Sequence, residues 1–332
     1  MNKLLKPEDA EQGLGVLQST LPVVESARHV WIDNRALADL REDMIKNEGV
    51  ADELGSRFQW CNDELKMATA ILVLNAWNFC FWPDRGQDVW SIEHEGKEFK
   101  GYKALAFCVE RALAEGLDLT DPKCLKKLTQ KKMKNVFRGK GEIPMLAERT
   151  ENAREIGEIL VRDWGGDFVN LIKAADGSAV SFVELIVASF PSFDDVGIYY
   201  GREVKFYKRA QILAADLMRS LGNQSLLNFH DAHQLSAFAD YKVPQILEAR
   251  GVLRYSPQLQ SLLSERECLP KGDPLEMEIR ACMVWAVEAL RESLTEQGKD
   301  WSALEVGAMI WELGRTLAQD LRPYHRTRTI FY

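Results

Sequence analysis

The sequence predicts a mainly α-helical protein, and two features of its residues support this. Apolar residues recur at helical spacing in long segments, most clearly in Phe206–Leu221 and Pro274–Leu294. Alternation typical of strands is confined to one stretch, Val89–Tyr102. The composition, 46% hydrophobic and 28% charged over 332 residues, is that of a folded globular protein. The chain has no repeat or linker, so we expect one helical domain over residues 1–332 with a small β-hairpin insertion.

Helical spacing begins near the N-terminus, in Leu4–Leu17 and Ala36–Asn47. The segment Asn62–Phe81 is apolar nearly all round, which predicts a central buried helix. We expect Asn62 to cap the start of this helix and Pro83 to end it, because proline disfavours a helical conformation in the residue before it.

The Val89–Tyr102 segment predicts the hairpin. Apolar and polar residues alternate from Trp90 to His94, and Glu95-Gly96 supplies a turn. Helical spacing resumes at Lys103, and Asp121-Pro122 marks a further helix start with proline at its first position.

The second half of the chain is expected to be helical up to its last residues. Two or three helices are predicted between residues 147 and 190 with a break at Trp164–Gly166, and others cover Phe206–Leu221, Pro274–Leu294 and Ser302–Leu317. Gly222 stands where glycine commonly terminates a helix. The final PYHRTRTIFY lacks helical periodicity and is predicted to be extended.

Cysteine content is typical of a cytoplasmic protein, and the charge balance bears on the kind of partner. The net charge is −8, which argues against a polynucleotide as the main partner but not against a small anionic ligand. The 6 cysteines form no CxxC pair, as is typical of reduced thiols. His230 and His233 lack a third ligand nearby in the sequence, so we expect no metal and no cofactor. No apolar run reaches the length of a membrane span.

The predicted central helix carries polar residues that suit a ligand pocket. Asn75 and Asn78 are three residues apart and would share one helix face, with Trp82 and Asp84 following. Amides beside aromatic rings could hold the edge and the face of a planar heterocycle. The alternative is a buried amide pair, satisfied by neighbouring backbone, within an aromatic core.

Lys208 and Asp240 are the charged residues best placed for chemistry. Lys208 begins an amphipathic segment that also carries Asp216, and it could balance the charge of a buried aspartate, orient a sugar or phosphate, or belong to a solvated face. Asp240 interrupts the apolar FADYKVPQIL, in which a carboxylate could act as a general base or a nucleophile. An N-cap role for the helix that Pro244 helps to open is an equally good interpretation.

The C-terminal HRTRTIFY contains a possible phosphate clamp. Arg326 and Arg328 point to the same side of an extended chain, next to His325, and arginine can grip phosphate oxygens in bidentate fashion. The apolar end at Ile330–Tyr332 indicates a docked segment rather than a frayed basic tail. The lysine-rich run of residues 123–141 is more typical of a solvated face than of an RNA contact.

Four separated blocks resemble the queuosine salvage protein family: LNAWNFCFWPD, FYKRAQILAADL, FADYKVPQIL and RPYHRTRTIFY. The resemblance covers nearly the whole chain. It implies a helical fold similar to that of DNA glycosylases. It also implies a hydrolase that cleaves the N-glycosidic bond of queuosine 5′-phosphate and releases ribose 5-phosphate and the 7-deazaguanine base queuine, which can be reinserted into tRNA.

The resemblance also implies roles for residues. The family's catalytic aspartate maps onto Asp240, and its functional lysine maps onto Lys208. A carboxylate beneath the anomeric carbon would stabilise the oxocarbenium character that develops as the bond to the base breaks. We expect substrate contacts from three groups: Asn75, Asn78, Trp82 and Asp84 for the base; Phe238 and Tyr241 for the pocket walls; His325, Arg326 and Arg328 for the phosphate.

Two rival functions remain at this point. A glycosylase acting on a flipped base of DNA or RNA would need a basic groove, against which the charge balance speaks. A non-catalytic queuine or nucleotide binding protein would bind the base without cleaving anything. We expect a monomeric enzyme with a small-molecule substrate, no stable nucleic acid partner and no membrane contact.

Overall fold

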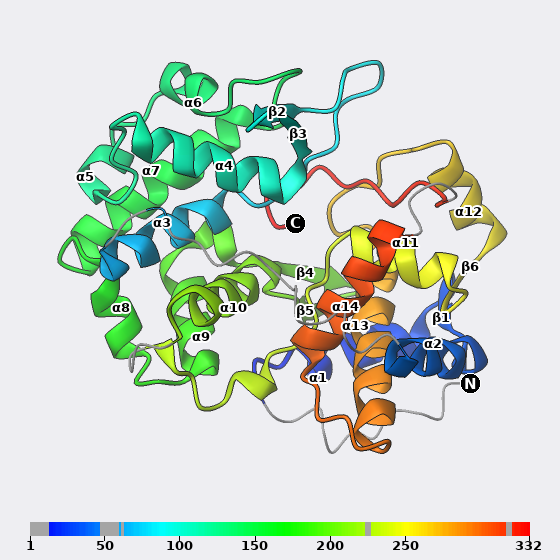
Figure 1. Cartoon of the computed structure of the whole chain (residues 1–332). Coiled ribbons are helices and arrows are strands. Elements are labelled where there is room, and N and C mark those ends of the chain that lie inside the picture. The colour runs from blue at the N-terminus through cyan, green and yellow to red at the C-terminus, as the bar shows by residue number, and fades with distance from the viewer. Residues whose placement is uncertain (1–12, 47–59, 61–62, 223–226, 317–320) are drawn as a thin grey trace. The chain divides into compact units, whose positions relative to one another are not determined.

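Helices make up most of the chain in the computed structural model, which describes residues 13–46, 60, 63–222, 227–316 and 321–332 (Figure 1). Within these ranges the strands form three antiparallel pairs, β1–β6, β2–β3 and β4–β5. The expectation of a mainly α fold is confirmed. The chain divides into two compact units: unit 1 is Met1–Ser56, Asp195–Gln211 and Asp231–Arg328, and unit 2 is Arg57–Asp194, Ile212–His230 and Thr329–Tyr332.

The core of unit 1 is α13 (Pro274–Thr295), which is buried along most of its length. Asp273 begins this helix by accepting a hydrogen bond from the backbone N–H of Leu275, and Pro274 occupies its first turn. The other elements of the unit are α1 (Val16–Ser26), β1 (Val30–Ile32), α2 (Asn34–Lys46), β4 (Val196–Tyr199), β5 (Arg202–Lys205), α11 (Lys242–Ala249), β6 (Leu253–Tyr255), α12 (Pro257–Ser264) and α14 (Ala303–Thr316). Of these, α1, α2, α11 and α14 pack on α13 (Figure 1).

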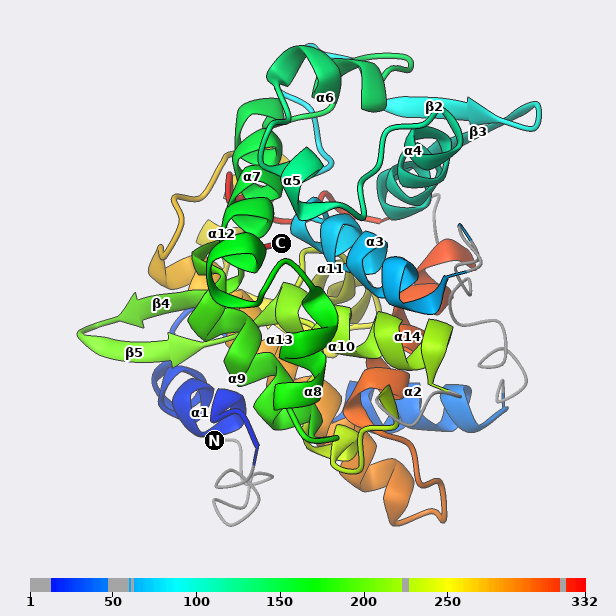
Figure 2. The same ribbon diagram turned by 90° about the vertical axis from the view of Figure 1, so that its left-hand side faces the viewer.

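Unit 2 is built around α3 (Glu64–Ala76) and α7 (Leu146–Asp163), which contact each other. Its other elements are β2 (Ser91–His94), β3 (Lys97–Lys100), α4 (Gly101–Ala114), α5 (Pro122–Leu125), α6 (Gln130–Val136), α8 (Phe168–Ala174) and α9 (Ala179–Ser189). Helices α5 and α6 lie against α7, and α8 lies against α3 and α9 (Figure 2). Helix α10 (Lys208–Leu221) begins in unit 1 and continues in unit 2.

Most of the predicted elements are confirmed, including the β2–β3 hairpin, the three helices between residues 146 and 189, α10, α13 and α14. The expected helix at Leu4–Leu17 lies largely outside the described residues. The described α1 begins only at Val16 and continues past Pro22 to Ser26. Its buried Val16, Thr20 and Val23 share one face, so packing against α13 outweighs the helix-breaking effect of the proline.

The expected extent of the central helix is wrong at its C-terminal end. Helix α3 ends at Ala76, well before Pro83, and Cys80 has a left-handed φ of 37°. The fully buried Arg149 of α7 explains this, because its guanidinium donates to the carbonyl oxygens of Trp77, Phe79 and Cys80. At the other end of α3 the cap is Asp63, whose side chain accepts from the N–H groups of Leu65 and Lys66; the predicted Asn62 lies outside the described residues.

Candidate active site

Asp240 stands in the loop that leads into α11 and is half-buried. Its Oδ1 accepts hydrogen bonds from the backbone N–H groups of Lys242 (2.9 Å) and Val243 (2.8 Å), which are otherwise unpaired at a helix start. Tyr241 occupies the residue directly before α11, but it is this oxygen of Asp240 that accepts from the first two N–H groups of the helix, which is the bonding that a capping role predicts. In the described part of the chain no group donates a hydrogen bond to Oδ2, which leaves that oxygen able to act on a ligand.

Lys208 is the first residue of α10, and its side chain is buried, with 6% exposure. The preceding Tyr207 has a φ of 50°, an uncommon and strained conformation for a residue with a side chain. Strain of this kind persists only where surrounding contacts impose it. One such contact is made by Asp195, whose backbone oxygen accepts from the N–H groups of Phe206 and Tyr207.

The charges of Lys208 and Asp240 act on each other. Burial lowers the pKa of Lys208 to about 8, while the nearby Asp240 carboxylate partly offsets that loss. Burial also raises the pKa of Asp240 above its ordinary value of 3.8, opposed mainly by Lys208. An ammonium group with a pKa near neutrality beside a desolvated carboxylate is an arrangement found at catalytic centres more often than on solvated surfaces.

Sequence reasoning missed two buried residues beside this pair, Arg280 and Asp195. Arg280 lies on α13 and forms a bidentate ion pair with Asp195, with Nη2–Oδ2 and Nη1–Oδ1 distances of 2.5 and 3.1 Å. The signal that could have found Arg280 is a charged residue, with Glu276 and Glu278 beside it, at the start of a long helical segment rich in apolar residues. Asp195 carries no comparable signal, since it follows Asp194 in a short loop-like stretch.

Aromatic contacts join the FADY block to the C-terminal segment within unit 1. The rings of Tyr241 and Tyr324 lie 4.8 Å apart, and the ammonium of Lys242 lies 4.4 Å from the centre of the Tyr324 ring. Tyr241 is buried and Phe238 is half-buried. Two of the resembling blocks, far apart in sequence, therefore meet beside Asp240.

The C-terminal segment is extended, as predicted, and its side chains alternate in burial. His325 and Thr327 are buried, whereas Arg326 and Arg328 are partly exposed, so the two arginines share one side. Burial, aided by the charge of Arg280, lowers the pKa of His325 to about 3, which makes its imidazole neutral at physiological pH. In unit 2 the chain end is docked, with the Tyr332 carbonyl accepting from the Cys80 N–H (2.9 Å).

The four residues expected to hold the base all belong to unit 2. Asn75 is fully buried on α3, and its amide nitrogen donates to Asp216 Oδ2 (2.8 Å), which also accepts from the Tyr102 hydroxyl (2.7 Å). Because α3 ends at Ala76, Asn78 does not share a helix face with Asn75. Asn78 and Trp82 are buried in the segment after α3, and Asp84 is exposed there; their binding roles stay predictions.

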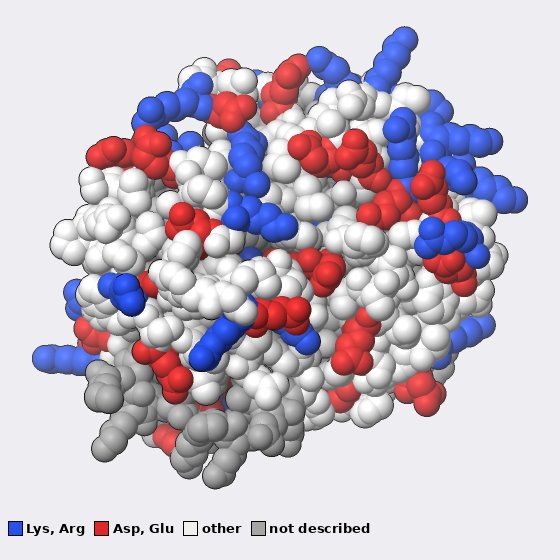
Figure 3. Space-filling view, turned by 180° about the vertical axis from the view of Figure 1, so that it is seen from behind, with Lys and Arg blue, Asp and Glu red and all other residues white. Residues whose placement is uncertain are grey.

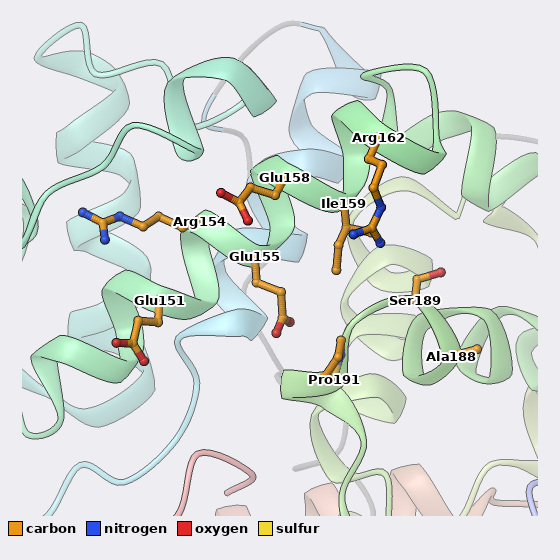
Figure 4. A pocket seen from close by; sticks show the side chains of 9 residues that line it. All are labelled: Glu151, Arg154, Glu155, Glu158, Ile159, Arg162, Ala188, Ser189 and Pro191. Atoms are coloured by element: carbon orange, nitrogen blue, oxygen red, sulfur yellow. The ribbon is translucent and has the colours of Figure 1, made fainter.

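A hollow of about 570 Å³ lies in unit 2 between α7 and the end of α9 (Figure 4). Its walls carry three glutamates and two arginines of α7, together with a few apolar groups: Glu151, Arg154, Glu155, Glu158, Ile159, Arg162, Ala188, Ser189 and Pro191. None of the predicted site residues lines it. An open, net acidic hollow does not suit a phosphorylated ligand.

Potential metal ligands do not cluster in the described ranges: no three His, Cys, Asp or Glu side chains converge there on one point.

Comparison with known proteins identifies relatives along nearly the whole chain. The sequence model described as "Queuosine salvage protein" matches residues 58–332. A protein of Sphaerobacter thermophilus is 44% identical over 324 residues, which is 98% of this chain and 99% of that protein. Proteins of Nematostella vectensis and Mus musculus are 37% and 35% identical over 81% of this chain and 83% of each relative. All three are named queuosine 5′-phosphate N-glycosylase/hydrolase.

The match includes the segments that carry Lys208 and Asp240 and the extended C-terminus. With this coverage and identity, the chain belongs to the queuosine salvage protein family.

Proposed function

We propose that this protein hydrolyses the N-glycosidic bond of queuosine 5′-phosphate, with Asp240 as the catalytic carboxylate and Lys208 assisting it. The relatives' printed name supports the reaction. The observation that carries the residue assignment is that the carboxylate of Asp240 has one oxygen fixed by two backbone N–H groups and the other uncommitted, with the buried Lys208 near enough for the two charges to interact.

In the proposed reaction the bond between the ribose anomeric carbon and the base nitrogen breaks, and its electron pair leaves with the base. Positive charge then develops on the sugar, and the Oδ2 of Asp240 would stabilise it. Water supplies the new oxygen on the anomeric carbon and a proton for queuine, so the products are queuine and ribose 5-phosphate.

Two routes use the same carboxylate: Asp240 activates water directly, or it attacks the anomeric carbon and is later displaced by water. Intact-mass analysis after rapid acid quenching distinguishes them, because only the second route leaves a sugar ester on the protein. In both routes the pairing with Lys208 favours an ionised Asp240.

The departing base makes this reaction demanding. In a deazapurine a carbon replaces the N7 atom that would accept a proton in a purine, so the leaving group must be stabilised through its other polar atoms. Stabilisation of the positive charge on the ribose by a carboxylate must therefore contribute more to lowering the barrier than it would for a purine nucleotide.

The 5′-phosphate would be bound by arginine. Arg326 and Arg328 lie on the partly exposed side of the C-terminal segment, and their guanidinium groups suit bidentate contacts with phosphate oxygens. His325 lies on the opposite, buried side and is neutral, so we assign it a packing role beside Arg280 rather than a charged contact.

We further propose that the enzyme acts as a monomer on a free nucleotide in the cytoplasm. On the face drawn in Figure 3, basic and acidic side chains are intermingled, which is unlike the basic groove of a polynucleotide enzyme. The cysteines at positions 80, 108, 124, 268 and 282 are free thiols, as expected in a reducing compartment. No helix in the described part of the chain is long and apolar enough to cross a bilayer.

The test is incubation of the purified protein with queuosine 5′-phosphate, followed by chromatography of both products. Equal amounts of queuine and ribose 5-phosphate are expected, and the nucleoside queuosine serves as the comparison substrate for the phosphate requirement. Tight queuine binding by calorimetry with no product from either substrate would contradict the proposal and identify a carrier.

A further inference from the structure

We propose that Arg280 and Asp195 form a buried positioning pair that fixes the separation between Asp240 and Lys208. This inference rests on the function proposed above for those two side chains. Arg280 and Asp195 act through the peptide groups that carry the catalytic residues.

The path between the catalytic residues is short and consists of hydrogen bonds within unit 1. Arg280 Nε donates to the carbonyl oxygen of Ala239 (3.1 Å), the residue directly before Asp240. The other two nitrogens of the guanidinium bind both oxygens of Asp195. Asp195 Oδ2 also accepts from the backbone N–H of Lys208 (3.3 Å). Two side chains thus connect the backbone beside Asp240 to the backbone of Lys208.

The guanidinium of Arg280 is held in one orientation. Its central carbon lies 3.8 Å from the centre of the Phe206 ring, and Nη1 lies 3.3 Å from Oε1 of Glu276, one turn earlier on α13. Arg280, Asp195 and Glu276 are all buried, with exposures of 3%, 2% and 1%. The planar guanidinium, fixed in this way, sets both the angle and the distance between the Ala239 carbonyl and the Asp195 carboxylate. An ammonium group, which has no planar set of donors, could not set the angle.

Stability alone is a poor explanation for this arrangement. Desolvating buried ions costs free energy that their attraction often only balances, and apolar replacements of buried ion pairs are commonly neutral or stabilising. Apolar side chains could fill the same volume but could not aim hydrogen bonds at the Ala239 carbonyl and the Lys208 N–H. The directed bonds therefore point to positioning as the role of the pair.

A second connection joins the same two segments. Gln211, one turn into α10, donates from its amide nitrogen to Ser236 Oγ (3.0 Å) and accepts from the Ser236 backbone N–H (2.8 Å). Both residues are buried. The start of α10 and the loop before Asp240 are thus tied at two places, as expected for a constellation that must keep a narrow geometry.

The pair also sets the charge environment of Lys208. The acids facing Lys208 are Asp240 and Asp195, which raise its pKa, and the bases are Arg209 and Arg280, which lower it. Arg280 in turn faces Glu276 and the neutral His325. Loss of the Asp195 charge should therefore lower the pKa of Lys208, and loss of the Arg280 charge should raise it.

The experiment compares Arg280→Lys, Arg280→Gln and Asp195→Asn with two variants on the same helix, Glu278→Gln and Arg291→Lys. Glu278 is a buried carboxylate that binds the Tyr199 hydroxyl and the backbone N–H groups of Arg28 and His29, and Arg291 pairs with Glu288. Each protein is assayed for kcat, KM, melting temperature and the Lys208 pKa, the last by NMR of 13C-labelled lysine without substrate.

We expect kcat of Arg280→Lys to fall about 100-fold, the cost of misplacing a reacting group by about 1 Å, with little change in KM. The pKa of Lys208, and with it the alkaline limb of the pH profile, should move down in Asp195→Asn and up in Arg280→Gln. The two control variants should leave kcat and the Lys208 pKa unchanged, whatever they do to the melting temperature.

The proposal is overturned if folded Arg280→Lys keeps the wild-type kcat, or if kcat falls only in proportion to the folded fraction. If the Arg280 variants do not fold, Asp195→Asn decides: a wild-type kcat together with an unmoved Lys208 pKa contradicts the positioning role. Absence of queuine release from the wild-type protein would instead contradict the proposed function. The NMR measurement would still show whether the charge of Asp195 shifts the pKa of Lys208.

Discussion

Asp240 combines a structural and a proposed chemical role because its two oxygens are in different situations. Oδ1 accepts two backbone hydrogen bonds that start α11, and Oδ2 accepts none from any described residue. Helix capping orients the carboxylate without neutralising it. The helix-capping role and the chemical role, between which the sequence leaves the choice open, are therefore compatible.

The pH dependence of kcat/KM should report on Lys208 and Asp240. The proposed roles require ionised Asp240 and protonated Lys208, so activity should rise as Asp240 loses its proton and fall above pH about 8 as Lys208 loses its own. In Lys208→Gln we expect kcat/KM to be about 100-fold lower and the alkaline limb near pH 8 to disappear. An unchanged alkaline limb in Lys208→Gln would show that another group controls it.

The sequence points to the residues proposed to react, but not to the buried residues that contact their backbone. Asp240 and Lys208 lie in recognisable blocks, and short-range spacing already suggests a capping role for Asp240. Arg280 binds the Ala239 carbonyl and Asp195 across separations of 41 and 85 residues, and no local pattern encodes such pairings. Buried ion pairs of this kind become visible only once the chain is folded.

Among the elements, α3 shows how one side chain can set a helix end. The apolar sequence continues beyond Ala76, yet the chain leaves the helix there, and Arg149 donates hydrogen bonds to the carbonyl oxygens of Trp77, Phe79 and Cys80. The guanidinium also stacks 4.2 Å from the centre of the Phe79 ring. Hydrophobic periodicity predicts that α3 is buried but gives no sign of the arginine that ends it.

Arg149→Met should destabilise the protein by about 3 kcal/mol or more, because it removes three buried hydrogen bonds from a charged donor at about 1 kcal/mol or more each. Urea unfolding measures this. Arg162→Met, on the same helix but exposed and paired with its neighbour Asp163, is the control and should change the free energy of unfolding by less than about 0.5 kcal/mol. Equal destabilisation by both variants would contradict the role given to Arg149.

The sequence analysis did not predict the strands β1, β4, β5 and β6. β1 and β6 have 3 residues each, too few for alternation to stand out from neighbouring helices. β1 and β6 also pair across more than 200 residues, from Val30 to Tyr255. The β2–β3 hairpin has its turn and both its strands adjacent in sequence, which made it predictable. The β4–β5 hairpin, Val196–Lys205, is built in the same way, and its absence from the predicted elements has no such physical explanation.

For the whole molecule, charge is the property that bears most directly on function. A net charge of −8 opposes approach to a polyanion, although the run from Lys123 to Lys140 is locally basic and its charged side chains are exposed. A small nucleotide bound by a few arginines is not subject to the same long-range repulsion at physiological salt.

We therefore expect no tRNA binding at about 150 mM salt, measured by fluorescence anisotropy of labelled tRNA. A Lys131→Glu/Lys132→Glu variant, altered within the exposed basic run, should hydrolyse queuosine 5′-phosphate with unchanged kcat/KM. Micromolar tRNA binding by the wild type that the double variant abolishes would refute the view that the substrate is a free nucleotide alone.

The central claim is that the carboxylate of Asp240 performs the glycosidic chemistry, and Asp240→Asn tests it most directly. The amide oxygen of asparagine can still accept the N–H groups of Lys242 and Val243, so the start of α11 and the melting temperature should be preserved. Queuine release from queuosine 5′-phosphate, followed by chromatography under single-turnover conditions, should then fall by at least about 1000-fold. Release within about tenfold of the wild-type rate would show that the catalytic carboxylate lies elsewhere.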